Sequence, residues 1–181
     1  VAAYVILASV MGPALETLGL EKLAAHMFMF YFGAIAPITP PVALAAYAAG
    51  GIAKADPMKI GWQAVRLGAV SFFVPFAFVN DPSLLLMGTA SAIAGNCLTA
   101  IFGAIALAVG LEGYLFKTFP AGAIGYFLRM MALSAGILLI WPNIFYSLTG
   151  AVLLIVVVIY QLLSRRNKVS GIVVTTEPMV K

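Results

Sequence analysis

Long apolar stretches, separated by short polar turns, make up most of this chain. The first stretch, residues 1–15, is too short to span a bilayer alone and is closed by Gly12-Pro13. It is predicted to be the end of a membrane span or one arm of a hairpin. A second stretch runs from Leu23 to Ile52, and later stretches predict helices at about 67–79, 84–110, 124–140 and 144–163. The pattern predicts an all-α, polytopic integral membrane protein.

The stretch from Leu23 to Ile52 cannot form one continuous helix, because prolines interrupt its centre. Proline has no N–H and its ring clashes with the preceding turn, so the carbonyls four residues earlier lose their helical donors. The prolines are Pro37, Pro40 and Pro41, and the carbonyls affected belong to Gly33, Ala36 and Pro37. We predict two half-helices, 23–36 and 42–52, that together form a discontinuous helix. The stretch either crosses the membrane once or re-enters on the same side.

Thr39 gives this break two further expected properties. Thr39-Pro40 is typical of an N-cap followed by proline at the first helical position, so the second half-helix is expected to restart there. The Thr39 hydroxyl, with the Ala36 and Pro37 carbonyls, also offers the oxygen ligands that a hard cation such as sodium requires. Discontinuous membrane helices hold coupling ions in this way. The alternative is a kink whose carbonyls are satisfied by water and neighbouring Ser or Thr side chains.

The later helices carry caps and small residues. Asp56-Pro57 predicts the N-cap and first turn of the next helix, which Pro75 should kink. In the 84–110 helix small residues recur every four positions, which allows close helix packing. They form two rows: Gly95, Thr99 and Gly103, and Ala100, Ala104 and Ala108. Candidates for hydrogen bonds across that contact are Ser91, Asn96 and Thr99. Residues 112–125 are predicted to form an interfacial connection, with room for a short surface helix.

Composition supports a membrane protein and argues against most enzymes. Hydrophobic residues make up 64% of the chain and charged residues 9%, with a mean hydropathy of +1.10. The single cysteine, Cys97, excludes an internal disulfide, and neither a metalloprotease motif nor a nucleophile elbow is present. The single histidine, His26, is interpreted as an interfacial or packed imidazole. We therefore predict no enzymatic activity, no cofactor and, since basic residues are not clustered with aromatics, no nucleic-acid binding.

Charge predicts the orientation. With one crossing by residues 23–52, nine of the ten Lys and Arg residues share one face, and only Lys22 lies on the other. The nine are Lys54, Lys59, Arg66, Lys117, Arg129, Arg165, Arg166, Lys168 and Lys181. Because positive loops stay in the cytoplasm, the C-terminus is predicted to be cytoplasmic. Residues 165–181 are expected to form a cytoplasmic tail that is loose from Ser170 onward.

Several segments resemble the large permease subunit of tripartite ATP-independent periplasmic (TRAP) transporters, in particular the fused permeases that work with TAXI-type binding proteins. They are His26-Met-Phe-Met-Phe-Tyr-Phe-Gly33, Ile38-Thr-Pro-Pro-Val-Ala-Leu-Ala-Ala-Tyr-Ala-Ala49, Ile52-Ala-Lys-Ala-Asp-Pro-Met58 and Arg66-Leu-Gly68. The likeness is dense from about Ala14 to Pro82 and thinner afterwards. Because the chain starts inside an apolar stretch, it is expected to be the C-terminal part of such a permease.

The resemblance implies a sodium-coupled, elevator-type importer in the bacterial inner membrane. Its substrates would be small organic acids, such as C4-dicarboxylates or related carboxylates, delivered by a periplasmic TAXI-type binding protein. A small membrane subunit would be fused upstream. The family's sodium ligands are a threonine and the carbonyls three residues before and after it, which correspond here to Thr39, Ala36 and Val42.

The resemblance also divides the chain into parts. Residues 1–55 would be the C-terminal part of the transport domain, with the loop and helix break at Gly33, Pro37, Pro40 and Pro41, and residues 56–164 would be additional transmembrane helices. The alternative is a structural or assembly subunit, in which the break only bends a helix for packing. An intramembrane enzyme would need catalytic residues outside this sequence.

Overall fold

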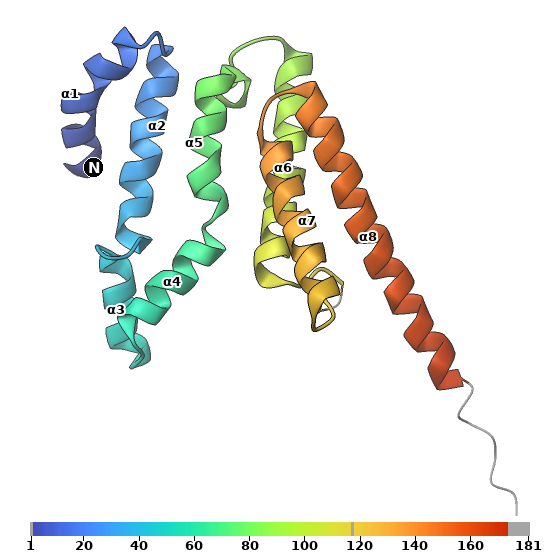
Figure 1. Cartoon of the computed structure of the whole chain (residues 1–181). Helices are drawn as coiled ribbons and strands as arrows, with labels where there is room; N and C mark the ends of the chain where they lie inside the picture. Colours follow the sequence, from blue (N-terminus) through green and yellow to red (C-terminus); the bar gives the residue numbers. More distant parts are fainter. Residues whose placement is uncertain (1, 117, 174–181) are drawn as a thin grey trace, which may run out of the picture.

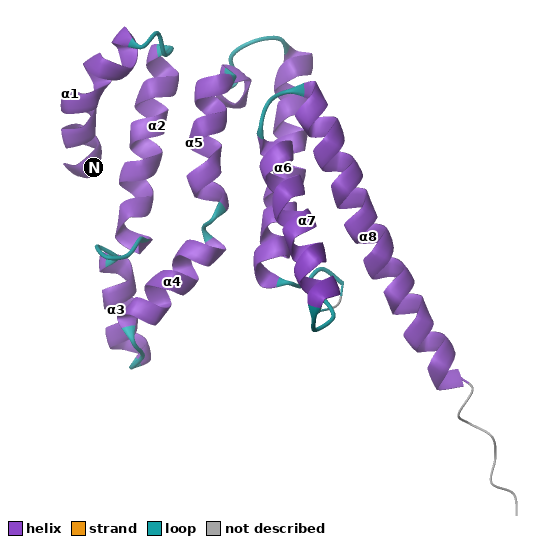
Figure 2. Ribbon diagram, viewed as in Figure 1, coloured by secondary structure: helices purple, strands orange, loops and turns teal. Residues whose placement is uncertain are grey.

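The computed structural model of this chain consists of helices joined by loops (Figures 1 and 2). It describes residues 2–116 and 118–173, and for residues 165–173 it describes the backbone alone. The α-helices are α1 (Ala2–Thr17), α2 (Lys22–Ile35), α3 (Leu44–Ala53), α4 (Pro57–Leu67), α5 (Val70–Asn80), α6 (Ala90–Glu112), α7 (Ala123–Ile140) and α8 (Ile144–Val173). Two 3-10 turns, η1 (Ala36–Ile38) and η2 (Pro82–Leu85), interrupt them. The all-α prediction is confirmed.

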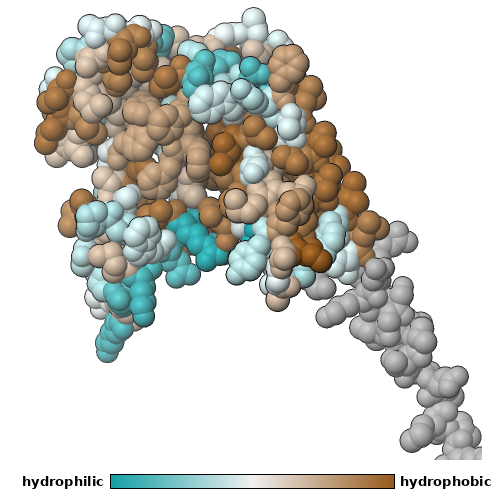
Figure 3. All heavy atoms as spheres, in the orientation of Figure 1, coloured by the Kyte–Doolittle hydropathy of each residue, from teal (hydrophilic) through white to brown (hydrophobic). Residues whose placement is uncertain are grey.

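Three helices are long and apolar enough to cross a membrane within the described part of the chain: Ala90–Glu112, Ala123–Ile140 and Ile144–Ser164. The pair α4 and α5, bent by 41° at its break, adds a fourth candidate if it counts as one span. Helices α1, α2 with η1, and α3 are apolar but shorter. Figure 3 shows hydrophobic residues over much of the upper left flank, where α1 lies, and along the coloured part of α8 on the right, with more polar residues between them at the top, as lipid contact at the flanks requires.

Helices α6 and α7 approach closely through glycines. A Cβ added at Gly103 would lie 2.7 Å from Ile140 Cγ1 and 2.9 Å from the Gly136 carbonyl oxygen. A Cβ at Gly136 would lie 2.6 Å from Leu107 Cγ. The prediction that α6 packs through small residues is therefore right for Gly103. The two predicted rows are wrong in detail, because Gly95 faces open space and the buried face continues through Ala106 and Gly110.

The start of α6 differs from the expected helix 84–110. Residues 82–85 form η2, Leu86 adopts a left-handed conformation (φ 63°), and the α-helix begins only at Ala90 with Thr89 as its N-cap. Asp81 supports the turn by accepting from the Ser83 N–H at 2.9 Å. Pro82 and Gly88 favour a loop over a helix, which explains why α6 does not begin before Ala90.

The predicted hydrogen bonds across the α6 contact are not formed. Asn96 Nδ2 instead donates to Ser83 Oγ at 2.7 Å and Asp81 Oδ2 at 3.1 Å, which ties α6 to the preceding turn. Thr99 donates to the Asn96 carbonyl on its own helix, and Ser91 contacts the Thr89 hydroxyl. The Thr99 bond is favoured because a short polar side chain reaches its own helix backbone more easily than a neighbouring helix.

A break at Gly68–Ala69 divides the predicted helix after Asp56 into α4 and α5, which are bent by 41° relative to each other, and α5 continues through Pro75. The Asp56 carboxylate accepts from the Met58 N–H at 2.9 Å, which confirms the predicted N-cap. Pro75 lies buried inside α5. A Cβ at Gly68 would meet Ile38 Cδ1 at 3.2 Å, so the missing side chain at the break is what allows Ile38 to approach.

The last two spans agree with the sequence, whereas the connection before them contains no helix in its described residues. An isolated bridge joins Tyr114 and Thr118, and Lys117 between them lies outside the described residues. Helix α8 continues to Val173, beyond the predicted end of the span. The expected loose tail from Ser170 is therefore helical up to Val173, and residues 174–181 lie outside the described part.

Aromatic pairs position α2 against α5. Phe76 makes edge-to-face contacts with Phe28 and Phe32, with ring centroids 5.3 and 6.0 Å apart, and Tyr31 packs on Phe78 at 5.4 Å. Figure 1 shows α3 continuing from α2 toward one end of the molecule, where the connection between α6 and α7 also lies. The Glu16–Lys22 turn and η2 lie at the opposite end.

Candidate functional site

The helix break lies where the sequence predicts it. Helix α2 ends at Ile35, and its C-cap Ala36 donates its N–H to the Phe32 carbonyl. Residues Ala36–Ile38 form η1, after which the chain is extended at Thr39 (φ −100°, ψ 118°). The Pro40–Pro41 peptide bond is cis. Helical hydrogen bonding stops here because prolines replace the donors that α2 would need to continue.

Thr39 closes the end of α2 rather than opening α3. Its hydroxyl donates to the Ile35 carbonyl at 2.7 Å, and its N–H donates to the Ala36 carbonyl at 3.1 Å. The expectation that the Ala36 carbonyl lacks a donor is therefore wrong. A carbonyl oxygen has two lone pairs and a hydroxyl oxygen can accept while it donates, so both oxygens keep a free acceptor direction.

Helix α3 begins at Leu44 and not at Thr39. Its N-cap is Ala43, which has a left-handed backbone (φ 35°, ψ 41°) and makes no side-chain capping bond. The Thr39 carbonyl accepts from the Ala43 N–H at 3.0 Å, so residues 39–43 form a turn of their own. A left-handed conformation costs an alanine about 1–2 kcal/mol. Such strain persists only where the surrounding structure fixes the backbone.

Most of the predicted site residues share one shallow cavity of about 220 Å³. It is lined by Phe32, Ile35, Ala36, Thr39, Pro40, Pro41, Val42 and Phe72. The expected ligand residues Ala36, Thr39 and Val42 are thus brought to one wall. Gly33 and Pro37 do not line it: a Cβ at Gly33 would lie 3.3 Å from the Tyr4 backbone nitrogen, and Pro37 is exposed. Gly33 serves the packing of α2 on α1.

The bent pair α4 and α5 supports this loop from outside. A Cβ at Gly61 would lie 3.0 Å from Pro40 Cγ and 3.5 Å from Ala43 Cβ, so α4 fits against the break only because Gly61 lacks a side chain. Ile38 rests on Gly68 at the second break, and Phe72 of α5 completes the cavity wall. Two interrupted helices therefore contact each other at their interruptions.

The remaining candidate groups lie apart from the break. His26 Nδ1 is 3.0 Å from the Tyr4 hydroxyl, which agrees with a packed imidazole. Glu112 forms an ion pair with Arg66, Oε1 to Nε at 3.2 Å, at the end of α6. Among the described residues, no cluster of three His, Cys, Asp or Glu side chains has the spacing of a metal site. The polar atoms at the break are therefore backbone carbonyls and the Thr39 hydroxyl.

Comparison with protein families shows which family the part of the chain around this break belongs to. The model of the "Tripartite ATP-independent periplasmic transporter, DctM component" family matches residues 1–93, which cover α1–α5, η2 and the start of α6. The chain belongs to the DctM family. Comparisons with curated proteins and with solved structures gave no match. The match includes the whole break and its support by α4 and α5.

Membership of the DctM family settles the general activity. DctM proteins are the large membrane component of TRAP transporters, which are secondary transporters that depend on a binding protein. The protein is thus a multi-pass membrane component of a bacterial transporter and not an enzyme. Its partners are a periplasmic binding protein and a small membrane subunit.

The sequence reasoning missed three residues that shape the site of this DctM protein. Gly61 and Gly68 admit Pro40 and Ile38, and Ala43 takes the strained conformation before α3. A signal was present for Gly61, since an isolated glycine inside a helical pattern usually has a packing reason. No comparable signal marks Ala43, because alanine disfavours positive φ.

Proposed function

We propose that this chain is the permease part of a sodium-coupled importer of small organic acids such as C4-dicarboxylates, delivered by a TAXI-type binding protein. The observation that carries the proposal is that Ala36, Thr39 and Val42 line one cavity at the junction of two half-helices. Ion-coupled transporters use such discontinuous helices to hold a cation with unwound carbonyls.

The donor set suits sodium better than a multivalent cation. Calcium sites combine carbonyls with charged carboxylates, and transition metals favour imidazole or thiolate ligands; the cavity lining contains none of these side chains. The Thr39 hydroxyl and the Ala36 carbonyl can each accept one further contact, and the Val42 carbonyl would be the third ligand. Neutral oxygens can coordinate a singly charged cation, so no carboxylate has to be buried in the membrane.

The helix ends favour charges of opposite sign. The C-terminal end of α2 carries partial negative charge from its last carbonyls, which favours a cation beside Ala36. The start of α3 carries partial positive charge, and Ala43 supplies no capping side chain to its first N–H groups. Sodium would therefore order the loop 36–42, after which the anionic substrate binds next to it.

The wider arrangement follows from this role. We infer that residues 1–55 belong to a transport domain of elevator type and that the helices in 56–164 pack around or beyond it. Trp62 and Tyr114 lie near the positively charged end, which would be cytoplasmic together with the tail 165–181. The small membrane subunit would be fused upstream, and the protein would lie in the inner membrane.

One observation favours a purely structural break instead. The hydroxyl, the N–H and the carbonyl of Thr39 each already have a protein partner, so none of them needs an ion to be satisfied. In that case the break would only let α2 and α3 fit against α4. The two functions differ in one measurable property, because only the ion site links transport to sodium.

Uptake by the complete transporter in proteoliposomes tests the proposal. With the binding protein present and a carboxylate substrate supplied, an inward sodium gradient is expected to drive accumulation. An equal potassium or choline gradient should not. If substrate accumulates equally in all three salts, sodium coupling is refuted. The break would then have only a structural role.

Gly61→Ala is expected to weaken the ion site from a distance. The new methyl group would lie 3.0 Å from Pro40 Cγ, so the loop or α4 must shift, at a cost of about 1 kcal/mol. If that cost falls on the ion-bound loop, the sodium concentration for half-maximal uptake rises roughly fivefold. The matched control is Gly51→Ala in α3, where nothing lies within 4 Å of the added Cβ. If Gly61→Ala and Gly51→Ala show the same sodium dependence, Gly61 does not support the ion site.

A further inference from the structure

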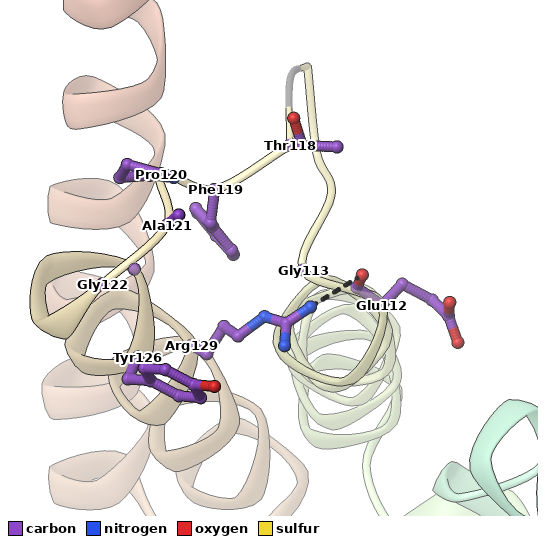
Figure 4. Close-up of a pocket in the computed structure, with 10 residues that line it drawn as sticks. Glu112, Gly113, Thr118, Phe119, Pro120, Ala121, Gly122, Tyr126 and Arg129 are labelled. Carbon is purple, nitrogen blue, oxygen red and sulfur yellow. Dashed lines mark hydrogen bonds between the residues drawn. The ribbon is translucent and has the colours of Figure 1, made fainter.

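A polar cavity lies at the end of α6 and α7, remote from the helix break (Figure 4). Its volume is about 300 Å³, and it is formed by the first turn of α7, the end of α6 and the connection between them. Its lining includes Phe119, Gly122, Gly125, Tyr126 and Arg129. Nothing in the transport cycle proposed above uses this cavity.

Glycines shape the cavity around the Arg129 guanidinium. A Cβ at Gly113 would overlap the guanidinium, and one at Gly125 would overlap the Pro120 carbonyl oxygen. Gly113 also has a positive φ of 66°, which other residues rarely adopt. Arg129 can reach over the end of α6, and the connection can fold back on α7, only because both positions lack side chains.

The cavity carries an uncompensated positive charge within the described part of the chain. Arg129 Nη2 donates to the Glu112 backbone carbonyl at 3.1 Å, which is a neutral partner. The Glu112 carboxylate is paired with Arg66 instead, and Figure 4 shows it directed away from Arg129. The positive end of the α7 dipole lies at the same place and adds to the preference for an anion.

An apolar strip continues from the cavity along the outside of α7. Ile124, Phe127 and Met130 are exposed by 59%, 66% and 60%, and Tyr126 beside them presents a hydroxyl at the cavity. These side chains lie on a membrane-spanning helix, so acyl chains are their natural contact. A charged cavity followed by an apolar strip matches the two parts of a phospholipid, whereas free phosphate would use only the first.

We propose that this cavity binds the headgroup phosphate of an anionic phospholipid, with Arg129 as the contacting cation and the acyl chains against Ile124, Phe127 and Met130. Basic pockets between membrane helices at the cytoplasmic face bind such headgroups. The guanidinium offers two parallel donors to phosphate oxygens, which a lysine at this position would not. The site is independent of the sodium proposal.

Native mass spectrometry of the full-length transporter tests the site with phosphatidylglycerol as the probe. Arg129→Gln is expected to lower the affinity for phosphatidylglycerol about tenfold, since a charge-assisted contact is lost. Lys59→Gln removes one positive charge at an exposed position at the same end and should bind like the wild type. Equal binding by Arg129→Gln and wild type, or an equal loss in Lys59→Gln, would overturn the proposal.

Two further measurements need only the wild-type protein. Phosphatidylglycerol with a photoreactive group near its headgroup should crosslink mainly to the segment 113–130, and phosphatidylcholine should not compete for this site. Crosslinks spread evenly over the membrane helices would show contact without a site. If inorganic phosphate displaces the probe at low millimolar concentration, the cavity is a free-anion site and the lipid assignment is wrong.

Discussion

Replacing Thr39 with valine is expected to raise the sodium concentration for half-maximal uptake about ten- to hundredfold. Valine keeps the shape of threonine and removes the hydroxyl of a residue that lines the cavity together with Ala36. A contact between a neutral polar group and a charged partner contributes about 1.5–3 kcal/mol to the binding free energy. Each 1.4 kcal/mol is about tenfold in affinity. The measurement is sodium titration of carboxylate uptake by the complete transporter in proteoliposomes.

Thr149→Val is the matched control for this variant. The Thr149 hydroxyl donates to the Phe145 carbonyl at 2.8 Å, the same bond that Thr39 makes to Ile35 at 2.7 Å, but it lies on α8. If the effect came only from the loss of a hydroxyl that is bonded to its own backbone, Thr39→Val and Thr149→Val would change the sodium dependence equally. A Thr39→Ser variant keeps the oxygen and should retain most of the sodium affinity. Unchanged sodium dependence in Thr39→Val would leave Thr39 with only its capping role.

Gly103→Ala is expected to destabilise the α6–α7 pair by about 1–3 kcal/mol. The added carbon would lie 2.7 Å from Ile140 Cγ1, 2.9 Å from the Gly136 oxygen and 3.0 Å from the Ile140 nitrogen. Two of these atoms belong to the backbone, so side-chain rotation cannot relieve the overlap and the helices must separate. Thermal unfolding of the purified transporter in detergent should show a lower midpoint.

Gly95→Ala on the same helix separates packing from helix propensity. No atom lies within 4 Å of a Cβ at Gly95, and alanine favours the helix by about 1 kcal/mol over glycine. This variant should therefore be neutral or slightly more stable. A midpoint for Gly103→Ala that matches Gly95→Ala would mean that α6 and α7 are not in close contact in the transporter.

The sequence was sufficient for features that depend on local chemistry. Prolines remove donors wherever they lie, so the break at 36–42 could be placed, and Asp56-Pro57 could be recognised as a cap. Hydropathy was sufficient for α7 and for the start of α8. The resemblance to TRAP permeases rested on the same segments that the family match includes.

Features that depend on tertiary contact could not be placed in this way. The break at Gly68 lies where Ile38 approaches from a different helix, which no local pattern encodes. The restart of α3 at Leu44 depends on Ala43 accepting a conformation that its residue type disfavours. The pairing of Arg66 with Glu112 joins segments far apart in the chain, so no local pattern connected the two residues.

That ion pair has a mechanical consequence. Within the described chain, α1–α5 meet α6–α8 along an apolar seam that includes Ala77, Leu107 and Ile140. Polar contacts lie at both ends of this seam. At one end Arg66 pairs with Glu112 and donates to the Leu111 carbonyl, and at the other end Asn96 bonds to the turn that contains η2. Packed apolar side chains resist sliding, and an exposed ion pair contributes only about 0–1 kcal/mol, so the seam itself holds α5 against α6 and α7. In the division proposed above, Arg66 and Glu112 both lie within residues 56–164, so movement of residues 1–55 as a unit would leave this ion pair intact.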